Sequence, residues 1–359
     1  MNNYVHQYIT CYNGLMSVNT EKILGSVSNL VAPYTVPILI MECDFFNNFN
    51  KYGAGDLTYL SNRFGFDERV FDTVLHYLVK EKYLEKRLKD GNHVFELSDT
   101  SKEFLLRDSK YDLSIYVSLL VDVLPRKIGA SIISALKTGV PAKWNDGGSW
   151  EEQMKSGDIS RTFSQGMMSR GKYLMDLLSP ALQKILINRK KLIDVGGSLG
   201  DYCGRFTSDF DDLDCTVFDL EKVIIHAKEN VSAKNYQRIS FVSGDMFKDS
   251  FPTGYDAFFY SNAIHDWDMK QNKYLFDKTY KALSSKGVII IHDCHLANDK
   301  TGPDWAVDHS LYLSVFTHGR YYSRKEISDL LLEVGFKNIE IIETVAGISA
   351  IIGYKNECI

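Results

Sequence analysis

Five short apolar runs follow one another in the second half of the chain, and each one closes on polar residues. They cover residues 192–195, 216–218, 239–243, 255–260 and 287–291. Runs of this length and apolar character, with longer amphipathic stretches between them, are typical of buried parallel strands joined by helices. Because open α/β sheets bind ligands beyond the carboxyl ends of their strands, we predict a ligand site where these polar residues collect.

The first run turns abruptly into glycines, since Gly196, Gly197 and Gly200 follow Asp194. A strand that enters a glycine turn and then a helix exposes backbone N–H groups against which a nucleotide-like ligand can lie. A dinucleotide fingerprint needs G-x-G-x-x-G, but Ser198 occupies the place of its second glycine. A P-loop is excluded because no Gly-Lys-Ser/Thr follows. The alternative is that the glycines form a purely structural turn.

The following runs end on residues that suit the other parts of a nucleoside. Asp219 closes the second run, at the spacing at which a carboxylate accepts hydrogen bonds from ribose hydroxyls. Asp245 and Met246 close the third, and they offer an acid to an adenine amino group and a thioether to its face. The fourth leads to His265, which lies beside acids and a tryptophan. Taken alone, Asp219 could be a helix cap and His265 a satisfied polar residue.

In this order, the motifs Asp-Val-Gly-Gly-x-x-Gly, Phe-Asp-Leu, Gly-Asp-Met-Phe and Ile-His-Asp-Trp resemble the S-adenosylmethionine-dependent small-molecule O-methyltransferases, typified by the plant caffeate and hydroxyindole enzymes. The resemblance covers nearly the whole chain, and His-Asp-Trp is its most specific element. It implies S-adenosyl-L-methionine as cofactor, bound to a Rossmann-like, doubly wound α/β sheet, with an N-terminal, mostly helical, winged-helix-like dimerisation domain. The implied cofactor-binding residues are Gly196, Asp219, Leu220, Asp245, Met246 and Ser261.

The same resemblance assigns His265 as the catalytic base and Asp293 as the carboxylate that orients it. Methyl transfer from a sulfonium is an in-line displacement, so the enzyme aligns the acceptor oxygen and removes its proton. A phenol has a pKa of about 10 and imidazole titrates near neutrality, so a positioned neutral histidine can accept that proton. These residues predict O-methylation of a phenolic hydroxyl on a small aromatic substrate of the secondary-metabolite kind.

Two departures from the family pattern keep other chemistry open. Tyr321 stands where a second orienting glutamate is expected, and a tyrosine carries no charge at neutral pH. Ser261 replaces a basic residue that many relatives carry four positions before the histidine. The alternatives are C- or N-methylation, or a cofactor-bound decarboxylation, hydroxylation or rearrangement. We expect no metal, because the spacing of His292 and His295 matches no zinc or iron signature.

Candidate substrate residues come from two helical segments, one before the first apolar run and one after the last. Phe163 and Met167 are four residues apart and share a helix face, and in the resembled family such a pair walls the acceptor pocket. Tyr312 and Phe316 occupy positions that line the pocket in relatives. Such side chains predict an apolar, aromatic pocket for a flat ring system, although core packing would produce the same pattern.

The first half of the chain shows a different pattern. Residues 56–65 and 67–83 read as helix, turn and helix, and residues 84–97 read as a hairpin. This winged-helix pattern raises the hypothesis of a DNA-binding regulator, but acids offset the basic residues of the second helix and leave no basic face for phosphates. In the resembled family the module mediates dimerisation, which implies a homodimer with residues 23–36 and 113–124 as apolar surfaces.

Length and composition set the remaining expectations. The chain has 359 residues with 45% hydrophobic content, enough for more than one core. We expect a dimerisation domain over residues 1–110, connecting helices over 111–180 and a catalytic domain over 181–359. A net charge of −5 argues against nucleic-acid and membrane-surface partners. The six scattered cysteines and the lack of an apolar stretch that could span a membrane predict a cytoplasmic protein.

Overall fold

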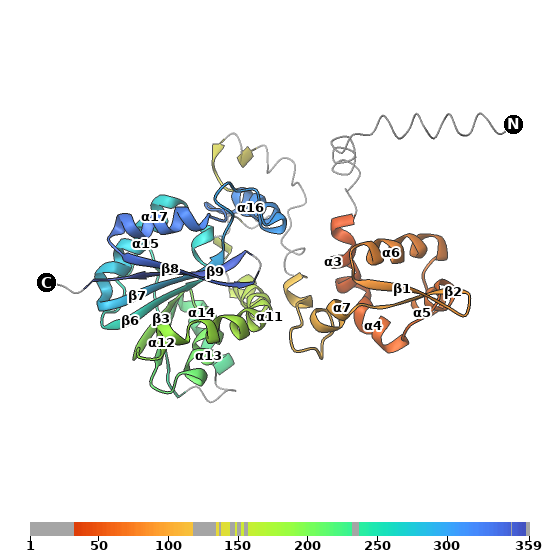
Figure 1. Ribbon diagram of the computed structural model, residues 1–359, viewed down its shortest axis with the longest axis horizontal. Coiled ribbons are helices and arrows are strands. Elements are labelled where there is room, and N and C mark those ends of the chain that lie inside the picture. The colour runs from red at the N-terminus through yellow and green to blue at the C-terminus, as the bar shows by residue number, and fades with distance from the viewer. Residues whose placement is uncertain are drawn as a thin grey trace. The chain divides into compact units, whose positions relative to one another are not determined.

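The structure is a computed structural model, shown in Figure 1. It describes residues 32–117, 134–135, 138–143, 148, 152–153, 157–231, 237–345 and 347–356. The chain divides into two compact units, Met1–Val121 and Asp122–Ile359. Most of the two apolar segments expected at a dimer surface, residues 23–36 and 113–124, lies outside the described residues.

The first unit is mostly helical with one hairpin. Its elements are α3 (Ala32–Cys43), α4 (Phe45–Tyr52), α5 (Leu57–Phe64), α6 (Glu68–Lys80), β1 (Leu84–Lys89), β2 (Asn92–Leu97) and α7 (Asp99–Phe104). The side chain of Asp56 caps α5 by accepting the N–H of Tyr59 at 2.8 Å. The hairpin turns at Asp90 and Gly91, whose φ angles of 50° and 82° suit a two-residue turn. The helices and the hairpin expected over residues 56–97 are therefore present.

Aromatic side chains fill the core of the first unit. Phe45, Phe49, Phe71 and Phe95 are all buried in one cluster. The ring of Phe64 stacks on Phe45 with the ring centroids 4.9 Å apart. Aromatic side chains bury large apolar areas, which allows a unit of this size to hold a core of its own.

The second unit is built on a seven-stranded sheet in the order β5-β4-β3-β6-β7-β9-β8. Its strands are β3 (Lys191–Val195), β4 (Asp214–Asp219), β5 (Ile239–Ser243), β6 (Tyr255–Ser261), β7 (Leu283–Cys294), β8 (Lys337–Val345) and β9 (Ile348–Tyr354). The first five pair in parallel, whereas β9 runs antiparallel to both β7 and β8. The five apolar runs are thus five adjacent parallel strands, and the predicted α/β fold is confirmed.

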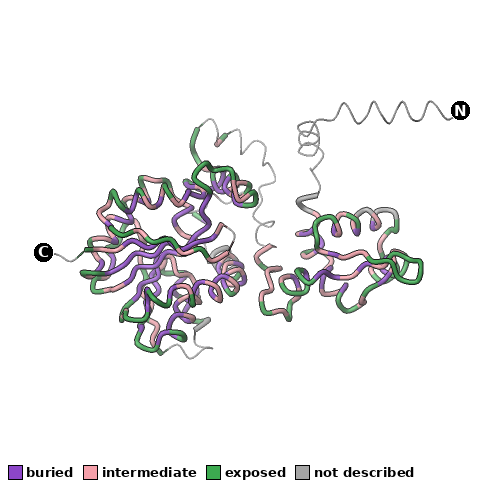
Figure 2. Tube along the Cα trace, viewed as in Figure 1, coloured by how far each residue is buried: buried purple, intermediate pink, exposed green. Residues whose placement is uncertain are grey.

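Helices cover both faces of this sheet (Figure 1). They are α11 (Gly157–Ala181), α12 (Gln183–Leu186), α13 (Asp201–Asp209), α14 (Glu221–Val231), α15 (Met269–Ala282), α16 (Asp304–Phe316) and α17 (Arg324–Val334), with a 3₁₀ turn, η2 (Ile264–Asp266). Leu192 packs into the core with Leu178 of α11 and Phe206 of α13. The next residue, Ile193, faces the other core with Phe276 of α15. Both faces are buried (Figure 2), so the strands are continuously apolar instead of alternating.

The order of the strands places a crevice beside the glycine turn. After β3 the chain adds β4 and β5 on one side, then crosses back to place β6 on the other side of β3. Ligands of open α/β sheets bind at such a switch point, outside the carboxyl ends of the strands. Gly196 follows β3 and Asn262 follows β6, so both flank this crevice. Among the described helices, none combines the length and apolar character needed to cross a membrane.

Candidate active site

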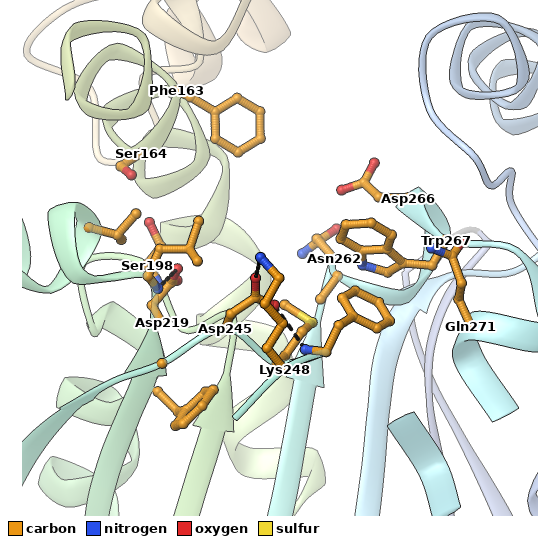
Figure 3. Close-up of a pocket in the computed structure, with 18 residues that line it drawn as sticks. Phe163, Ser164, Ser198, Asp219, Asp245, Lys248, Asn262, Asp266, Trp267 and Gln271 are labelled. Atoms are coloured by element: carbon orange, nitrogen blue, oxygen red, sulfur yellow. Dashed lines mark hydrogen bonds and ion pairs between the residues drawn. The ribbon is translucent and has the colours of Figure 1, made fainter. Parts of the chain in front are cut away.

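A cavity of about 420 Å³ lies at the carboxyl ends of the parallel strands (Figure 3). Its volume falls within the roughly 300–1,000 Å³ of small-molecule sites, which is room for a nucleoside-sized ligand. Its wall includes Phe163, Gly196, Ser198, Asp219, Leu220, Asp245, Met246, Asn262, Asp266 and Trp267. The structure therefore brings five of the six predicted cofactor-binding residues to one cavity.

Two glycines of the turn after β3 are required by its geometry. Gly196 has a φ of 73°, a left-handed backbone conformation that favours glycine, and it lies on the cavity wall. A Cβ on Gly197 would lie 2.8 Å from the Asp194 carboxyl carbon. Only glycine therefore lets the turn fold over Asp194.

Asp219 joins the glycine turn to the end of β4. Its Oδ2 accepts the Ser198 N–H at 2.9 Å, and its Oδ1 accepts the Leu220 N–H at 2.7 Å. Burial raises the pKa of Asp219 to about 6, although both N–H groups act to lower it. The side chain is thus mostly ionised at neutral pH, and it presents a carboxylate to the cavity at the predicted ribose position.

The loop after β5 carries the predicted adenine residues and is held in place by a lysine. Asp245 lies 3.2 Å from the exposed Lys248 ammonium through its Oδ2. Lys278 of α15 donates to the backbone oxygens of Met246 and Asp249, at 2.5 and 2.6 Å. Sequence reasoning did not identify Lys278, because nothing near it in the sequence indicates that it reaches a loop 30 residues away.

His265 and Asp293 form a buried pair that belongs to the wall of neither cavity, although Asp266 and Trp267, which follow His265, line the main one. His265 lies in η2, just beyond the end of β6, and its Nδ1 is 2.8 Å from both carboxylate oxygens of Asp293 on β7. Burial acts to lower the pKa of His265, but the negative charges of Asp293 and Asp266 outweigh it and raise that pKa. Because Asp293 is ionised and can only accept, the Nδ1 donates, and in the neutral imidazole Nε2 keeps the lone pair.

Tyr321 packs against this histidine where a carboxylate was expected. Its ring meets the His265 imidazole edge to face, with centroids 5.2 Å apart and an interplanar angle of 81°. The ring of His309 lies against it at 5.5 Å. A Cβ on Gly319 would lie 2.1 Å from the backbone oxygen of His265, so this loop packs tightly onto η2. The imidazole is therefore bonded to the Asp293 carboxylate and packed against the neutral ring of Tyr321.

The other predicted site residues are spread over a wider region. Ser261 does not line the main cavity; its Oγ lies 3.0 Å from Nδ1 of the buried His292. It faces a second cavity of about 80 Å³, which Met167 and Phe163 also line. Tyr312 and Phe316 pack together on α16 with centroids 5.0 Å apart, and neither belongs to the wall of the main cavity.

Three side chains near the site were missed from the sequence. Asn262 lines both cavities with a φ of 51°, a backbone conformation that asparagine tolerates better than most residues. Arg170 of α11 lines the smaller cavity, and Lys278 holds the loop after β5. The strand-to-turn position was a usable signal for Asn262, whereas the two cations have none in the sequence. Among the described residues, no group of three or more His, Cys, Asp or Glu could hold a metal ion.

Comparisons with known proteins agree with this geometry. Residues 134–337, more than half of the chain, match the family described as the O-methyltransferase domain. The acetylserotonin O-methyltransferase of Gallus gallus is 32% identical over 165 residues, 46% of this chain and 47% of that enzyme, so the match spans about half of that relative's length. The Bos taurus enzyme of the same name is 25% identical over 308 residues, 84% of this chain and 87% of that enzyme.

A solved structure shares the fold over nearly the whole length. The crystal structure of human N-acetylserotonin methyltransferase in complex with SAM superposes with a TM-score of 0.76 at 20% identity, covering 95% of this chain and 99% of that chain. The strand order, the glycine turn and the family match point to one conclusion. The chain belongs to the O-methyltransferase domain family.

Proposed function

We propose that this protein is an S-adenosylmethionine-dependent O-methyltransferase that acts on a phenolic hydroxyl of a small aromatic substrate, with His265 as general base. One observation carries the proposal. A buried histidine, bonded through Nδ1 to the Asp293 carboxylate, directly precedes Asp266 and Trp267, and these two residues line the same cavity as Asp219 and Asp245. This arrangement combines a nucleoside cradle with a proton acceptor.

The described residues fit the cofactor. Asp219 offers carboxylate oxygens at the end of β4 for the ribose hydroxyls, and Leu220 lies beside it on the cavity wall. Asp245 and Met246 would hold the adenine, and the backbone of Gly196 would face the methionine part. S-adenosylmethionine, when bound, supplies an electrophilic methyl group on a sulfonium.

The protein's own part in the reaction is to orient the acceptor and to take its proton. Asp293 accepts the Nδ1–H of His265, which fixes the tautomer and leaves Nε2 to receive the phenolic proton. The Asp293 charge then stabilises the imidazolium in this buried place. Because the pKa of His265 is raised and only its neutral form is a base, activity should rise as the pH increases through that pKa.

For the acceptor we propose a flat ring held among apolar side chains. Phe163 stands on the wall of the main cavity and Met167 on that of the smaller one, which supports the predicted pair on α11. Tyr312 and Phe316 of α16 would extend this apolar surface for the acceptor. The ring of Tyr312 stacks on the ring of His309, and His309 lies against Tyr321.

We also propose that the protein is a cytoplasmic homodimer that binds no nucleic acid, with the N-terminal helical region as the dimerisation element. Exposed apolar side chains on α3 support this, since Ile38 and Met41 are 47% and 39% exposed. Light scattering on the purified full-length chain tests the dimer, and a monomer at micromolar concentration would contradict it.

Product mass is the direct test of the reaction. The full chain is incubated with S-adenosylmethionine and a panel of phenols, and O-methylation adds one CH₂ while abolishing the phenolate absorbance at high pH. C-methylation adds the same mass but keeps that absorbance, and decarboxylation or hydroxylation changes the mass differently.

The role of the base is tested by His265→Ala. We expect kcat to fall by about 10²-fold or more, because a general base contributes that much, while the affinity for S-adenosylhomocysteine is retained. His93→Ala, on the exposed hairpin of the first unit, is the matched control and should leave activity unchanged. If His265→Ala methylates a phenol at the full rate, alignment alone carries the reaction and the assigned role is wrong.

A further inference from the structure

His265 lies in a turn that its own backbone hydrogen bonding holds only weakly. The 3₁₀ turn η2 spans Ile264–Asp266, and the hydrogen bond that closes it, from the Trp267 N–H to the Ile264 oxygen, is long at 3.3 Å. A helical segment of this length leaves most of its carbonyl groups without a partner inside the segment. The position of the imidazole therefore depends on groups that bind η2 from outside.

Asn272, in the first turn of α15, binds η2 at two points. Its side-chain amide donates to the backbone oxygen of Ile264 at 2.9 Å and to that of Trp267 at 3.0 Å. Backbone oxygens only accept, so it is the NH₂ group of the amide that faces them. Since Ile264 stands one residue before His265 and Trp267 two residues after it, one side chain bridges the turn that carries the histidine.

The structure fixes Asn272 itself. It is fully buried, and α15 begins just before it with a capping box. In this box the Asp268 carboxylate accepts the Gln271 N–H at 2.7 Å, and the Gln271 side chain accepts the Asp268 N–H at 3.1 Å. Burial of an amide costs free energy unless it is hydrogen-bonded, and asparagine is a poor residue for a helix. Packing alone therefore does not account for an asparagine at position 272.

The loop before α17 also binds this turn. The His318 N–H donates to the Asp266 oxygen at 3.1 Å, and the Tyr322 hydroxyl donates to the Trp267 oxygen at 2.5 Å. The Trp267 oxygen thus receives one donor from α15 and one from this loop. Two elements that are far apart in the sequence therefore hold η2 by its backbone.

We propose that Asn272 is a positioning residue for the general base, which holds η2 so that Nε2 of His265 meets the acceptor hydroxyl. The inference rests on the proposed function, because it takes His265 to be the base. Asp293 fixes the tautomer through Nδ1, whereas Asn272 fixes the backbone that carries the ring. Proton transfer needs the two heavy atoms within hydrogen-bond distance, so a small shift of the turn lowers the rate.

A double-mutant cycle with His265→Ala tests this role in the full-length chain. Asn272→Leu removes both donated hydrogen bonds at similar volume, and Asn272→Asp keeps the shape but replaces the NH₂ group with an oxygen. We expect either variant to lower kcat for a phenol by about 10-fold, because a slightly misplaced catalytic group loses at least this much. In the His265→Ala background neither should lower kcat further, because a positioning residue has no effect once its base is gone.

Calorimetry with S-adenosylhomocysteine and thermal unfolding accompany the cycle. The Kd of S-adenosylhomocysteine should stay nearly unchanged, because the residues proposed to hold the cofactor lie on other elements. Thr279→Val is the matched control: Thr279 is fully buried on the same helix, and its hydroxyl lies 2.6 Å from that of Tyr260. This variant loses a buried hydrogen bond away from η2 and should keep kcat.

The opposing outcomes separate this inference from the proposed function. An unchanged kcat in Asn272→Leu, or an equal loss of kcat in both backgrounds, would overturn the inference. Failure of both Asn272 variants to fold would overturn it too, because Asn272 would then serve the fold and not the base. If the unaltered chain methylates no phenol, the proposed function itself fails.

Discussion

The two halves of the proposed site, the cofactor half with Asp219 and Asp245 and the base half with His265 and Asp293, are assembled in different ways. In the cofactor half, Asp219 is the last residue of β4 and Asp245 lies two residues beyond β5, so the pairing of β4 and β5 alone brings them to one edge. In the base half, His265 and Asp293 come from a 3₁₀ turn and from a strand, and Tyr321 from a loop before α17. Backbone connectivity positions the first group, whereas side-chain packing positions the second. Variants in the first half should therefore change binding, and variants in the second should change rate and pH dependence.

The largest effect of this kind is expected from Asp293→Asn. The amide can still accept the Cys294 N–H that Asp293 accepts at 2.7 Å, but it removes the negative charge that faces His265. We expect kcat to fall by about 10²-fold, the usual scale of lost proton-transfer catalysis. Because the Asp293 charge raises the pKa of His265, its loss lowers that pKa, and the acid limb of the kcat/KM profile should move to lower pH.

Two measurements decide whether Asp293 belongs to the base half alone. The pH profile of kcat/KM must shift, and calorimetry with S-adenosylhomocysteine must give an unchanged Kd. If the acid limb does not move, His265 is not the group that titrates in the reaction. If the Kd rises as much as kcat falls, the division of the site into two halves is wrong.

In contrast to Asp293→Asn, Asp219→Ala should weaken cofactor binding and leave kcat nearly unchanged. It removes the acceptor proposed for the ribose hydroxyls and leaves the Ser198 and Leu220 N–H groups without their partner. We expect the Kd of S-adenosylhomocysteine to rise by about 10- to 10²-fold, with a much smaller change in kcat at saturating cofactor. Glu221→Gln, an exposed neighbour at the start of α14, is the matched control.

The pKa of Asp219 gives this prediction a second readout. Because that pKa is about 6 in the free protein, lowering the pH through 6 protonates the carboxylate and removes its capacity to accept two ribose hydrogen bonds. The affinity of the unaltered chain should fall over this interval, and that of Asp219→Ala should not. A fall of equal size in both proteins would assign the pH dependence to another group.

Smaller effects on kcat and on the pH profile are expected from substitutions of Tyr321, whose ring packs against His265 where the family pattern predicts a glutamate. Tyr321→Phe keeps the ring against His265 and should retain kcat within about twofold, a change within the ±0.5 kcal/mol of a benign substitution. Tyr321→Glu adds a negative charge beside the imidazole, so it should raise the pKa of His265 and move the acid limb to higher pH by about one unit.

Tyr321→Gln separates charge from shape in this series. Glutamine has nearly the shape of glutamate without its charge. The acid limb of the pH profile should therefore move to higher pH in the Glu variant and not in the Gln variant. Thermal unfolding of each protein checks that it is folded. A loss of activity in Tyr321→Phe would show that the hydroxyl, and not the ring, is what His265 requires.

The residues that backbone connectivity positions could be predicted from the sequence, whereas those that side-chain packing positions were harder to predict. The five strands, the glycine turn and the two strand-end acids were predicted because apolar runs and glycines are local signals. Tyr312 and Phe316 lie on α16 outside the wall of the main cavity, and their part in a substrate pocket stays a prediction. Arg170 escaped detection because a single arginine in a helix carries no local signal of what it faces.

The sequence by itself determined the fold, the family and the sheet edge at which we propose that the cofactor binds, because those depend on periodicity, on turn residues and on the direction of parallel strands. Only the tertiary structure decided that Asp293 accepts the Nδ1–H of His265, that Tyr321 lies against the imidazole as a ring, and that Arg170 reaches the cavity beyond Gly196. The first two contacts join residues 28 and 56 positions apart. Their geometry depends on how the helices and loops pack onto the sheet, which no local pattern records.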